Sequence, residues 1–396
     1  MIAEKMLKLG QSGSAIRDIA AYADARRSEI GSKNVFDFSI GNPNTPAPEK
    51  VKNTLIELLE SSDSLALHGY TAAPGAMNAR IAAAAQESER AGYAIPPECV
   101  YLTSGASSSL AITLAALVRP GEKVAVLAPF FPEYRVFAEA AGAELVVVPP
   151  AGEDMQPFMA AFEAAVEDGV AAVIINSPNN PSGAILSEQT LRVMAKILKV
   201  AEEEQGKSIY LIADEPYREL IYGDAKVPFV PNFYENTIVC YSYSKSFSLP
   251  GERLGYIMVP PCVEDGKTVF AAVCGAGRAL GYVCAPSLMQ NMLAACADVR
   301  PDLSTYEKNR DLLYGELSGM GFECVKPDGA FYLFVKAPKG DSASEFCEKA
   351  KQFEIMLVPS DSFGVAGYAR LAYCVSEQTA KNSLPAFKKL SELYGL

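Results

Sequence analysis

Ligands for metal ions are scarce in this sequence. His68 is its only histidine, and its nine cysteines include no C-x-x-C pair, so no Cys/His zinc site can be assembled. No apolar run approaches the roughly 18 residues that a membrane-spanning helix needs. The first stretch, "MIAEKMLKLGQSGS", has no apolar signal core. We therefore expect a reduced, soluble, cytoplasmic protein with no metal centre and no membrane partner.

Basic residues are also in the minority. The chain has 35 Lys and Arg against 47 Asp and Glu, a net charge of −12, which argues against binding to nucleic acid or to an anionic membrane surface. A small anionic ligand could still bind where the charge is locally positive. With 396 residues, the chain exceeds the roughly 250–300 residues that one core usually supports, so we expect two domains.

The middle of the chain alternates apolar runs with stretches of helix length. Five runs are nearly continuous in Val, Ile and Leu: 123–129, 144–149, 171–176, 209–214 and 237–244. Such runs are typical of strands buried on both faces of a largely parallel sheet. Helices are predicted between them at 157–168 and 187–205. The alternation predicts an α/β sheet covered by helices.

From about Pro286 onward the pattern changes. Helices are expected at 286–297 and 303–320, then short strands at "FECV", "AFYLFV" and "IMLVP", and a last helix at 377–394. This order is typical of a separate α+β domain. We predict a large domain at 45–285 and a small domain formed by 1–44 together with 286–396.

Polar residues follow several of the predicted strands. Asp214 ends one run, Asn180 lies just past another, and Lys245 follows "TIVCYSYS". Ligands of open α/β sheets collect at these strand ends. In "TSGASSSLAITLAAL", Gly105 allows a tight turn before an Ala/Leu helix whose first N–H groups could bind an anion. Arg253 could supply the countercharge. Ordinary readings stay open: an N-cap, a solvated strand end, or core packing.

Taken together, these residue types point to an aldehyde cofactor. The amine of Lys245 could form an imine with the aldehyde. Asp214 could hold a pyridine nitrogen protonated, so that the ring becomes an electron sink. Tyr217 or Asn180 could bind the ring hydroxyl, and Phe131 could stack on the ring face.

The motifs "GYTAAPG", "NNPSG", "ADEPY", "SYSKSFSLPGERLGY" and "GYARLAY" follow one another in the chain. In this order the sequence resembles class I aminotransferases, which are pyridoxal-phosphate enzymes of the aspartate aminotransferase fold, over nearly its whole length. The resemblance implies a mostly parallel sheet flanked by helices, with a smaller domain, and pyridoxal 5'-phosphate as cofactor. One departure is the N-terminal loop, where the family's G-x-P-D reads Gly41-Asn42-Pro43-Asn44.

The resemblance also assigns roles residue by residue. Lys245 matches the lysine that binds the cofactor covalently, Asp214 the partner of the pyridine nitrogen, and Tyr217 and Asn180 the groups on the cofactor oxygen. The remaining cofactor contacts would be Phe131 at the ring and, at the phosphate, Gly105, Ala106, Ser107, Ser242, Ser244 and Arg253.

Other matches concern the substrate and a second subunit. Arg370 matches the arginine that clamps the substrate α-carboxylate, and Gly41 a backbone contact to the substrate. Tyr70 matches a tyrosine that reaches the neighbouring subunit's phosphate site, so we expect a homodimer. Arg278 falls near an arginine that reaches across the dimer to the distal carboxylate of an acidic substrate; the alternative is a solvated or interface arginine. His68 is read as a loop residue.

The implied reaction moves an amino group from an L-amino acid to a 2-oxo acid. Lys245 would transfer the α-proton, and Arg370 would orient the substrate. We expect 2-oxoglutarate as acceptor and an acidic donor such as aspartate, although Ser107 stands where some relatives have a lysine for the second carboxylate. The alternatives are an aromatic or aliphatic donor, a lyase or decarboxylase on the same scaffold, and a non-enzymatic binding module.

Overall fold

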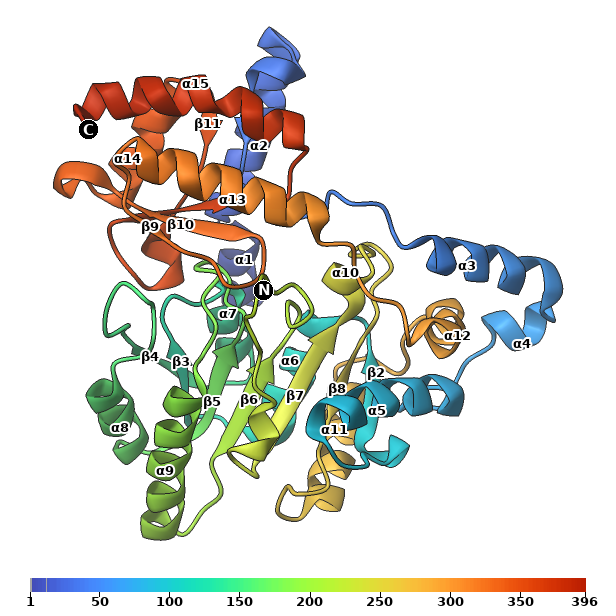
Figure 1. The fold of residues 1–396 in the computed structure, drawn as a ribbon. Coiled ribbons are helices and arrows are strands. Elements are labelled where there is room, and N and C mark those ends of the chain that lie inside the picture. Colours follow the sequence, from blue (N-terminus) through green and yellow to red (C-terminus); the bar gives the residue numbers. More distant parts are fainter. Residues whose placement is uncertain (1, 12) are drawn as a thin grey trace.

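The computed structural model describes residues 2–11 and 13–396, and its centre is a seven-stranded sheet (Figure 1). The strand order is β2-β8-β7-β6-β5-β3-β4, and only β8 runs antiparallel to its neighbours. The strands are β2 (Val100–Thr103), β3 (Lys123–Leu127), β4 (Glu144–Val148), β5 (Val170–Asn176), β6 (Tyr210–Asp214), β7 (Thr237–Ser242) and β8 (Gly255–Met258). The predicted mostly parallel α/β sheet is confirmed.

Helices cover both faces of this sheet, which explains why the strands are so apolar. Every residue of β5 and β7 is buried. One core joins the sheet to α6, α7 and α11, and another joins it to α8 and α9. These helices are α6 (Ala106–Leu117), α7 (Glu133–Ala140), α8 (Met159–Glu167), α9 (Glu188–Gln205) and α11 (Gly266–Ala279). A strand buried on both faces gains free energy from each apolar side chain, whichever way it points.

A third group of helices lies at the β2 end of the sheet, on the right of Figure 1. There α12 packs against α3, α4 and α5. Their bounds are α3 (Glu49–Ser61), α4 (Ser64–His68), α5 (Met77–Ala91) and α12 (Ser287–Cys296). The packing of α12 against these helices joins chain segments on either side of the boundary expected near residue 285. The domain boundaries stay a prediction.

The smaller unit sits above the carboxyl ends of the large sheet's parallel strands (Figure 1). It has a four-stranded antiparallel sheet, β12-β13-β10-β9, and a parallel pair, β1-β11. Its strands are β1 (Phe36–Asp37), β9 (Cys324–Val325), β10 (Tyr332–Lys336), β11 (Ile355–Met356), β12 (Val358–Pro359) and β13 (Tyr368–Ala372), and its helices α2 (Ala15–Ile30), α13 (Ser304–Gly319), α14 (Ala343–Lys351) and α15 (Glu377–Tyr394). Pairing of β1 with β11 joins the N-terminal segment to the C-terminal part. A further helix, α1 (Glu4–Gln11), precedes α2.

One strand is shorter than its apolar run predicts. The run 237–244 was expected to be strand throughout, but β7 ends at Ser242, and Tyr243–Ser246 form the single-turn helix α10. The reason is local: Ser242 Oγ accepts a hydrogen bond from the Ser244 N–H at 3.2 Å, which caps the new turn. Lys245 therefore projects from a helical turn.

Within the described residues, no helix combines the length and the apolar character needed to cross a bilayer.

Candidate active site

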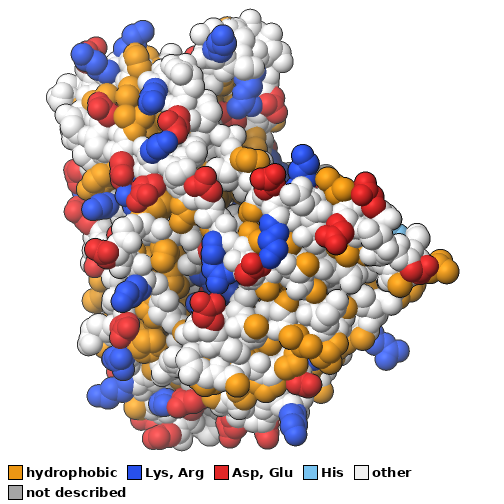
Figure 2. Space-filling view, turned by 45° about the vertical axis from the view of Figure 1, so that its right-hand side comes forward, with side chains coloured by type: hydrophobic (Ala, Val, Ile, Leu, Met, Phe, Trp, Pro, Cys, Tyr) orange, Lys and Arg blue, Asp and Glu red, His pale blue; other side chains and the backbone are white. Residues whose placement is uncertain are grey.

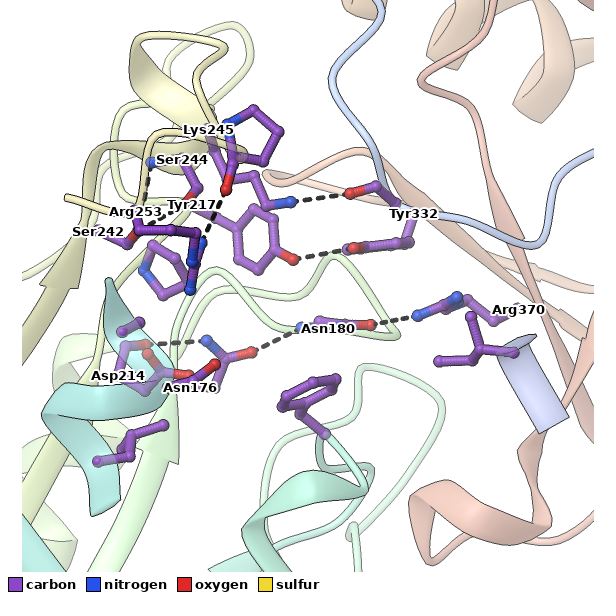
Figure 3. A pocket seen from close by; sticks show the side chains of 18 residues that line it. Asn176, Asn180, Asp214, Tyr217, Ser242, Ser244, Lys245, Arg253, Tyr332 and Arg370 are labelled. Atoms are coloured by element: carbon purple, nitrogen blue, oxygen red, sulfur yellow. Dashed lines mark hydrogen bonds between the residues drawn. The ribbon is translucent and has the colours of Figure 1, made fainter. Parts of the chain in front are cut away.

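A cavity of about 280 Å³ lies between the strand ends of the large sheet and the small domain (Figure 3). Residues at the ends of strands in the large sheet, from β10 and β13 of the small domain and from the N-terminal segment meet in it. The site residues predicted from the sequence that line it are Gly41, Ala106, Ser107, Phe131, Asn180, Asp214, Tyr217, Ser242, Ser244, Lys245, Arg253 and Arg370. The fold therefore gathers side chains that are far apart in sequence into a single space.

Lys245 is the amine of this cavity. Its Nζ donates a hydrogen bond to the carbonyl oxygen of Gly41 at 2.8 Å. Burial lowers the pKa of Lys245 to about 8, and the positive charges of Arg370 and Arg253 act in the same direction. A substantial fraction of the amine is then neutral near physiological pH, the form in which nitrogen is a nucleophile and a base.

Asp214 ends β6 and is buried. Its Oδ2 accepts a hydrogen bond from the hydroxyl of Tyr134 at 2.5 Å, whereas the buried Oδ1 has no hydrogen-bond partner among the described residues. Burial raises the pKa of Asp214 to about 7, against the opposing effect of the Tyr134 hydrogen bond. A buried carboxylate with one free oxygen fits a cationic N–H donor, and a protonated pyridine nitrogen is such a group.

Three more of the predicted cofactor contacts, Phe131, Tyr217 and Asn180, line the same cavity. Phe131 lines the cavity, and its ring packs edge to face against that of Tyr134, with centroids 5.8 Å apart. The hydroxyl of Tyr217 lies 2.8 Å from that of Tyr332. The backbone N–H of Asn180 donates to Asn176 Oδ1 at 2.7 Å, which fixes the loop after β5. An aromatic face and directed polar groups are the usual means by which proteins orient a planar ligand.

The start of α6 forms a cradle suited to an anion. Gly105 precedes the helix with φ of +89°, and a Cβ added there would lie 2.8 Å from Arg253 Nη2, so the position favours glycine. Opposite, the hydroxyls of Ser242 and Ser244 are 2.7 Å apart. Free N–H groups, two hydroxyls and a guanidinium in one place fit a phosphate. Together with Asp214 and Lys245, this cradle fits pyridoxal phosphate.

Arg370 lies on the side of the small domain. It comes from β13, is 2% exposed, and donates from Nη1 to Asn180 Oδ1 at 3.0 Å and from Nη2 to the carbonyl oxygen of Ser39. Its Nε has no partner within the described part of the chain. Figure 3 shows the side chain entering the cavity opposite Asp214. A guanidinium held in this way has its planar fork available to a carboxylate.

Three residues singled out from the sequence lie outside this cavity. Tyr70, just after α4, is 97% exposed, and Arg278, in the last turn of α11, is also exposed. His68 ends α4 and is exposed.

Six residues that line the cavity were not predicted from the sequence: Ile16, Leu110, Asn176, Pro216, Pro250 and Tyr332. Tyr134, which does not line the cavity but donates a hydrogen bond to Asp214, was not predicted either. Asn176 ends β5, and its Nδ2 donates to the backbone oxygen of Asp214 at 2.8 Å, so the strand-end argument that found Asp214 could have found it. Tyr134 stands one helical turn after Phe131 in "FPEY", a spacing that could have suggested it. The sequence around Ile16 and Tyr332 has no comparable signal.

The chain is similar over most of its length to known aminotransferases. The family model for aminotransferase class I and II matches residues 33–387. A Thermus aquaticus protein named "Probable aspartate/prephenate aminotransferase" is 29% identical, covering 96% of this chain and 99% of its own. The "Aromatic-amino-acid aminotransferase 2" of Thermococcus litoralis is 28% identical, covering 91% of this chain and 92% of its own.

Solved structures of aminotransferases are similar to this chain as well. An aminotransferase from Eubacterium rectale is 48% identical, covers 100% of both chains and superposes with a TM-score of 0.97. The aspartate aminotransferase of Thermotoga maritima is 26% identical, covers 98% of this chain and 99% of its own, and gives a TM-score of 0.85. With a family match over most of its length and this shared fold, the chain belongs to the class I and II aminotransferases.

Proposed function

We propose that this aminotransferase uses pyridoxal 5'-phosphate, bound at Lys245, to move an amino group from an L-amino acid to a 2-oxo acid. The proposal rests on three features that meet in one cavity: Lys245, the carboxylate of Asp214, whose Oδ1 has no hydrogen-bond partner among the described residues, and the anion cradle at the start of α6. 2-Oxoglutarate is proposed as acceptor and aspartate as the favoured donor.

When bound, the cofactor supplies an electron sink that stabilises negative charge at the substrate Cα. The chain's own residues do the rest. The ionised Asp214 would keep the ring nitrogen protonated, and Lys245 Nζ would take up the α-proton from the substrate and pass it to the cofactor. Arg370 binds the α-carboxylate in a fixed orientation, which decides which bond of the Cα is broken. Holding the carboxylate at Arg370 favours proton removal over decarboxylation, the reaction of a lyase on the same scaffold.

The charges that line the cavity also support a second class of donor, one with an uncharged side chain. Within the described residues, the only cations that line the cavity are Lys245, Arg253 and Arg370, and the proposal gives each of these another role. The side-chain end of the substrate would then meet an uncharged wall that includes Ile16. The Thermococcus litoralis relative is named for aromatic amino acids. An aromatic or aliphatic donor is therefore the second candidate.

A dimer would supply the cation that an acidic donor requires. Tyr70 is 97% exposed. Exposed apolar side chains also occur near it in the chain, at Leu65 and Met77, and in the turn after α11, at Leu280, Tyr282 and Val283. That turn leads into α12, which packs against α4, and Ser287 Oγ at the start of α12 donates to Leu67 O at 2.8 Å. Figure 2 shows apolar side chains gathered on the lower right part of the molecule, on the face turned toward the viewer. We propose that the surface around Tyr70 and the turn after α11 packs against a second copy, bringing Tyr70 and Arg278 to that copy's cavity.

The cytoplasm is the proposed location, since all nine cysteines, which lie within the described residues, are unpaired.

A panel of amino donors with 2-oxoglutarate tests the reaction itself. An aminotransferase converts its cofactor to the amine form with the donor alone, whereas a lyase turns over without doing so. Release of ammonia or carbon dioxide without transfer to 2-oxoglutarate would overturn the proposal.

A further inference from the structure

Tyr332 belongs to the small domain by its backbone and to the cavity by its side chain. It begins β10, is 2% exposed, and its hydroxyl lies 2.8 Å from that of Tyr217, which follows β6 of the large domain. The two rings meet edge to face, with centroids 5.7 Å apart. Edge-to-face packing of buried aromatic rings is a favourable contact. The contact therefore joins the small domain to the large domain at the cavity (Figure 3).

Tyr332 also contacts two other parts of the site. The guanidinium of Arg370 lies 4.8 Å from the centroid of its ring, a cation–π arrangement. A Cβ added to Gly41 would come 2.0 Å from the Tyr332 hydroxyl, so the glycine leaves room for it, while the Gly41 carbonyl accepts the hydrogen bond from Lys245. One side chain thus touches a proposed cofactor contact, the proposed carboxylate clamp and the loop that holds the lysine.

The two hydroxyls of the Tyr217–Tyr332 pair can donate only two hydrogen bonds between them. Burial raises the pKa of Tyr332 to about 12 and that of Tyr217 well above its ordinary value, so both hydroxyls stay protonated at neutral pH. Each hydroxyl has one proton to donate, and one of the two is used in the bond between them. If Tyr217 donates to a cofactor oxygen, Tyr332 must be the donor within the pair. Tyr332 therefore determines whether the Tyr217 proton is available to the cofactor.

We propose that Tyr332 is a positioning residue for transamination, acting through its hydroxyl on Tyr217 and through its ring on Arg370. The inference rests on the proposed function, because it requires pyridoxal phosphate at Lys245. The hydroxyl keeps the Tyr217 O–H directed at the cofactor's ring oxygen. The ring supports the guanidinium in the orientation that receives the substrate carboxylate. The small domain would in this way influence both the cofactor's electronic state and the binding of substrate.

Two substitutions separate these actions. Tyr332→Phe removes the hydroxyl and keeps the ring, whereas Tyr332→Leu removes both. Tyr373→Phe is the matched control: this tyrosine is also buried, its hydroxyl donates to Ala330 O at 3.2 Å, and it does not line the cavity. Tyr217→Phe and the double variant complete a cycle. Each protein is purified, loaded with pyridoxal phosphate and checked for native folding by thermal melting.

The first readout is the pH midpoint of the visible absorbance change of the loaded protein. A hydrogen bond donated to the ring oxygen stabilises its negative charge in the deprotonated form, so its loss lets the proton stay bound to higher pH. We expect Tyr332→Phe to raise the midpoint by about 0.4–1 pH unit, the value of one ordinary hydrogen bond. Tyr373→Phe should match wild type. The double variant should show the midpoint of Tyr217→Phe alone, because Tyr332 acts through Tyr217.

The second readout is the KM for the amino donor. Tyr332→Phe should change KM by less than about twofold, because the ring over Arg370 remains. Tyr332→Leu should raise KM by roughly two- to thirtyfold, the range of a cation–π contact. An unshifted midpoint in Tyr332→Phe, or shifts that add in the double variant, would overturn the inference and leave the proposed function standing. A wild-type protein that forms no visible band with pyridoxal phosphate would overturn both.

Discussion

The hydroxyl of Tyr134 donates a hydrogen bond to Asp214 Oδ2 at 2.5 Å, and the other oxygen of this carboxylate has no partner in the described part of the chain. The same tyrosine packs edge to face against Phe131. One side chain of α7 thus orients both the carboxylate proposed to hold the cofactor's nitrogen and the ring proposed to stack on its face. Hydrogen bonding to the charged form favours ionisation of Asp214 against its burial.

We expect Tyr134→Phe to weaken cofactor binding. Without the hydroxyl, the pKa of Asp214 rises above about 7, so less of the carboxylate is ionised at neutral pH. A hydrogen bond to a charged group contributes about 1.5 kcal/mol or more, which corresponds to a roughly tenfold higher Kd for pyridoxal phosphate. Equilibrium dialysis of the apoprotein measures this directly. Tyr234→Phe is the control, since its buried hydroxyl donates to Ile209 O at 2.6 Å and the residue does not line the cavity. An unchanged Kd for Tyr134→Phe would mean that this hydrogen bond does not support the cofactor.

The attachment point of the cofactor has a chemical test. Borohydride treatment of the loaded protein should fix the cofactor at Lys245, and peptide mapping should recover the label there. Lys245→Ala should fold normally but lose turnover by many orders of magnitude, because the covalent attachment and the general base are lost together. A label recovered on another lysine would refute the assignment.

The pKa of Lys245 gives a pH prediction for the apoprotein. Burial lowers this pKa to about 8, so the neutral amine becomes the main form above that pH and the ammonium below it. The rate at which pyridoxal phosphate attaches should therefore rise with pH and level off above about 8. An unperturbed lysine would give a midpoint near 10.4. Stopped-flow absorbance at a series of pH values distinguishes the two, and a midpoint above 10 would contradict the lowered pKa.

The proposed dimer predicts complementation between two inactive variants. In a hybrid of Tyr70→Ala and Lys245→Ala subunits, one site has an intact Lys245 and receives an intact Tyr70 from its neighbour. Random mixing should restore about a quarter of wild-type activity, since about half the dimers are hybrids and each has one working site. Should Tyr70 act within its own subunit, mixing would restore nothing. Sedimentation of the wild type as a fully active monomer would also exclude the dimer.

The sequence predicted the large sheet well for a physical reason. Strands such as β5 and β7 are buried on both faces, so their apolar runs are hardly interrupted, and their ends were misplaced by only a few residues. Asp214, Asn180 and Lys245 follow such strands, and the topology alone brings them to one edge. The chemical roles of these residues stay predictions.

What the sequence could not predict depends on packing between distant segments. The Tyr217–Tyr332 contact joins two domains, and neither local sequence indicates which tyrosine the other meets. The hydrogen bond from Tyr134 to Asp214 likewise joins α7 to the end of β6. The roles proposed for Tyr70 and Arg278 require a second copy of the chain, and the fold of one subunit does not test them.

Arg278 offers the test of substrate class. If this exposed arginine of α11 reaches the neighbouring cavity, it pairs there with the distal carboxylate of an acidic donor in a partly desolvated site. Losing one charge-assisted partner costs about 2–5 kcal/mol in such a setting. Arg278→Ala should therefore lower kcat/KM for aspartate or glutamate by at least about tenfold, since 1.4 kcal/mol corresponds to a factor of ten. For alanine or an aromatic donor, kcat/KM should barely change.

The matched control is Arg119→Ala, an exposed arginine paired with Glu122 on the surface, which should leave all donors unaffected. Equal losses for every donor in Arg278→Ala would indicate that the arginine stabilises the subunit contact, because a structural defect does not distinguish between side chains of the substrate. A wild-type enzyme that prefers aromatic or aliphatic donors to both acidic ones would exclude the acidic class whatever the variant does. In that case the uncharged wall around Ile16 would be the part of the cavity that selects the donor.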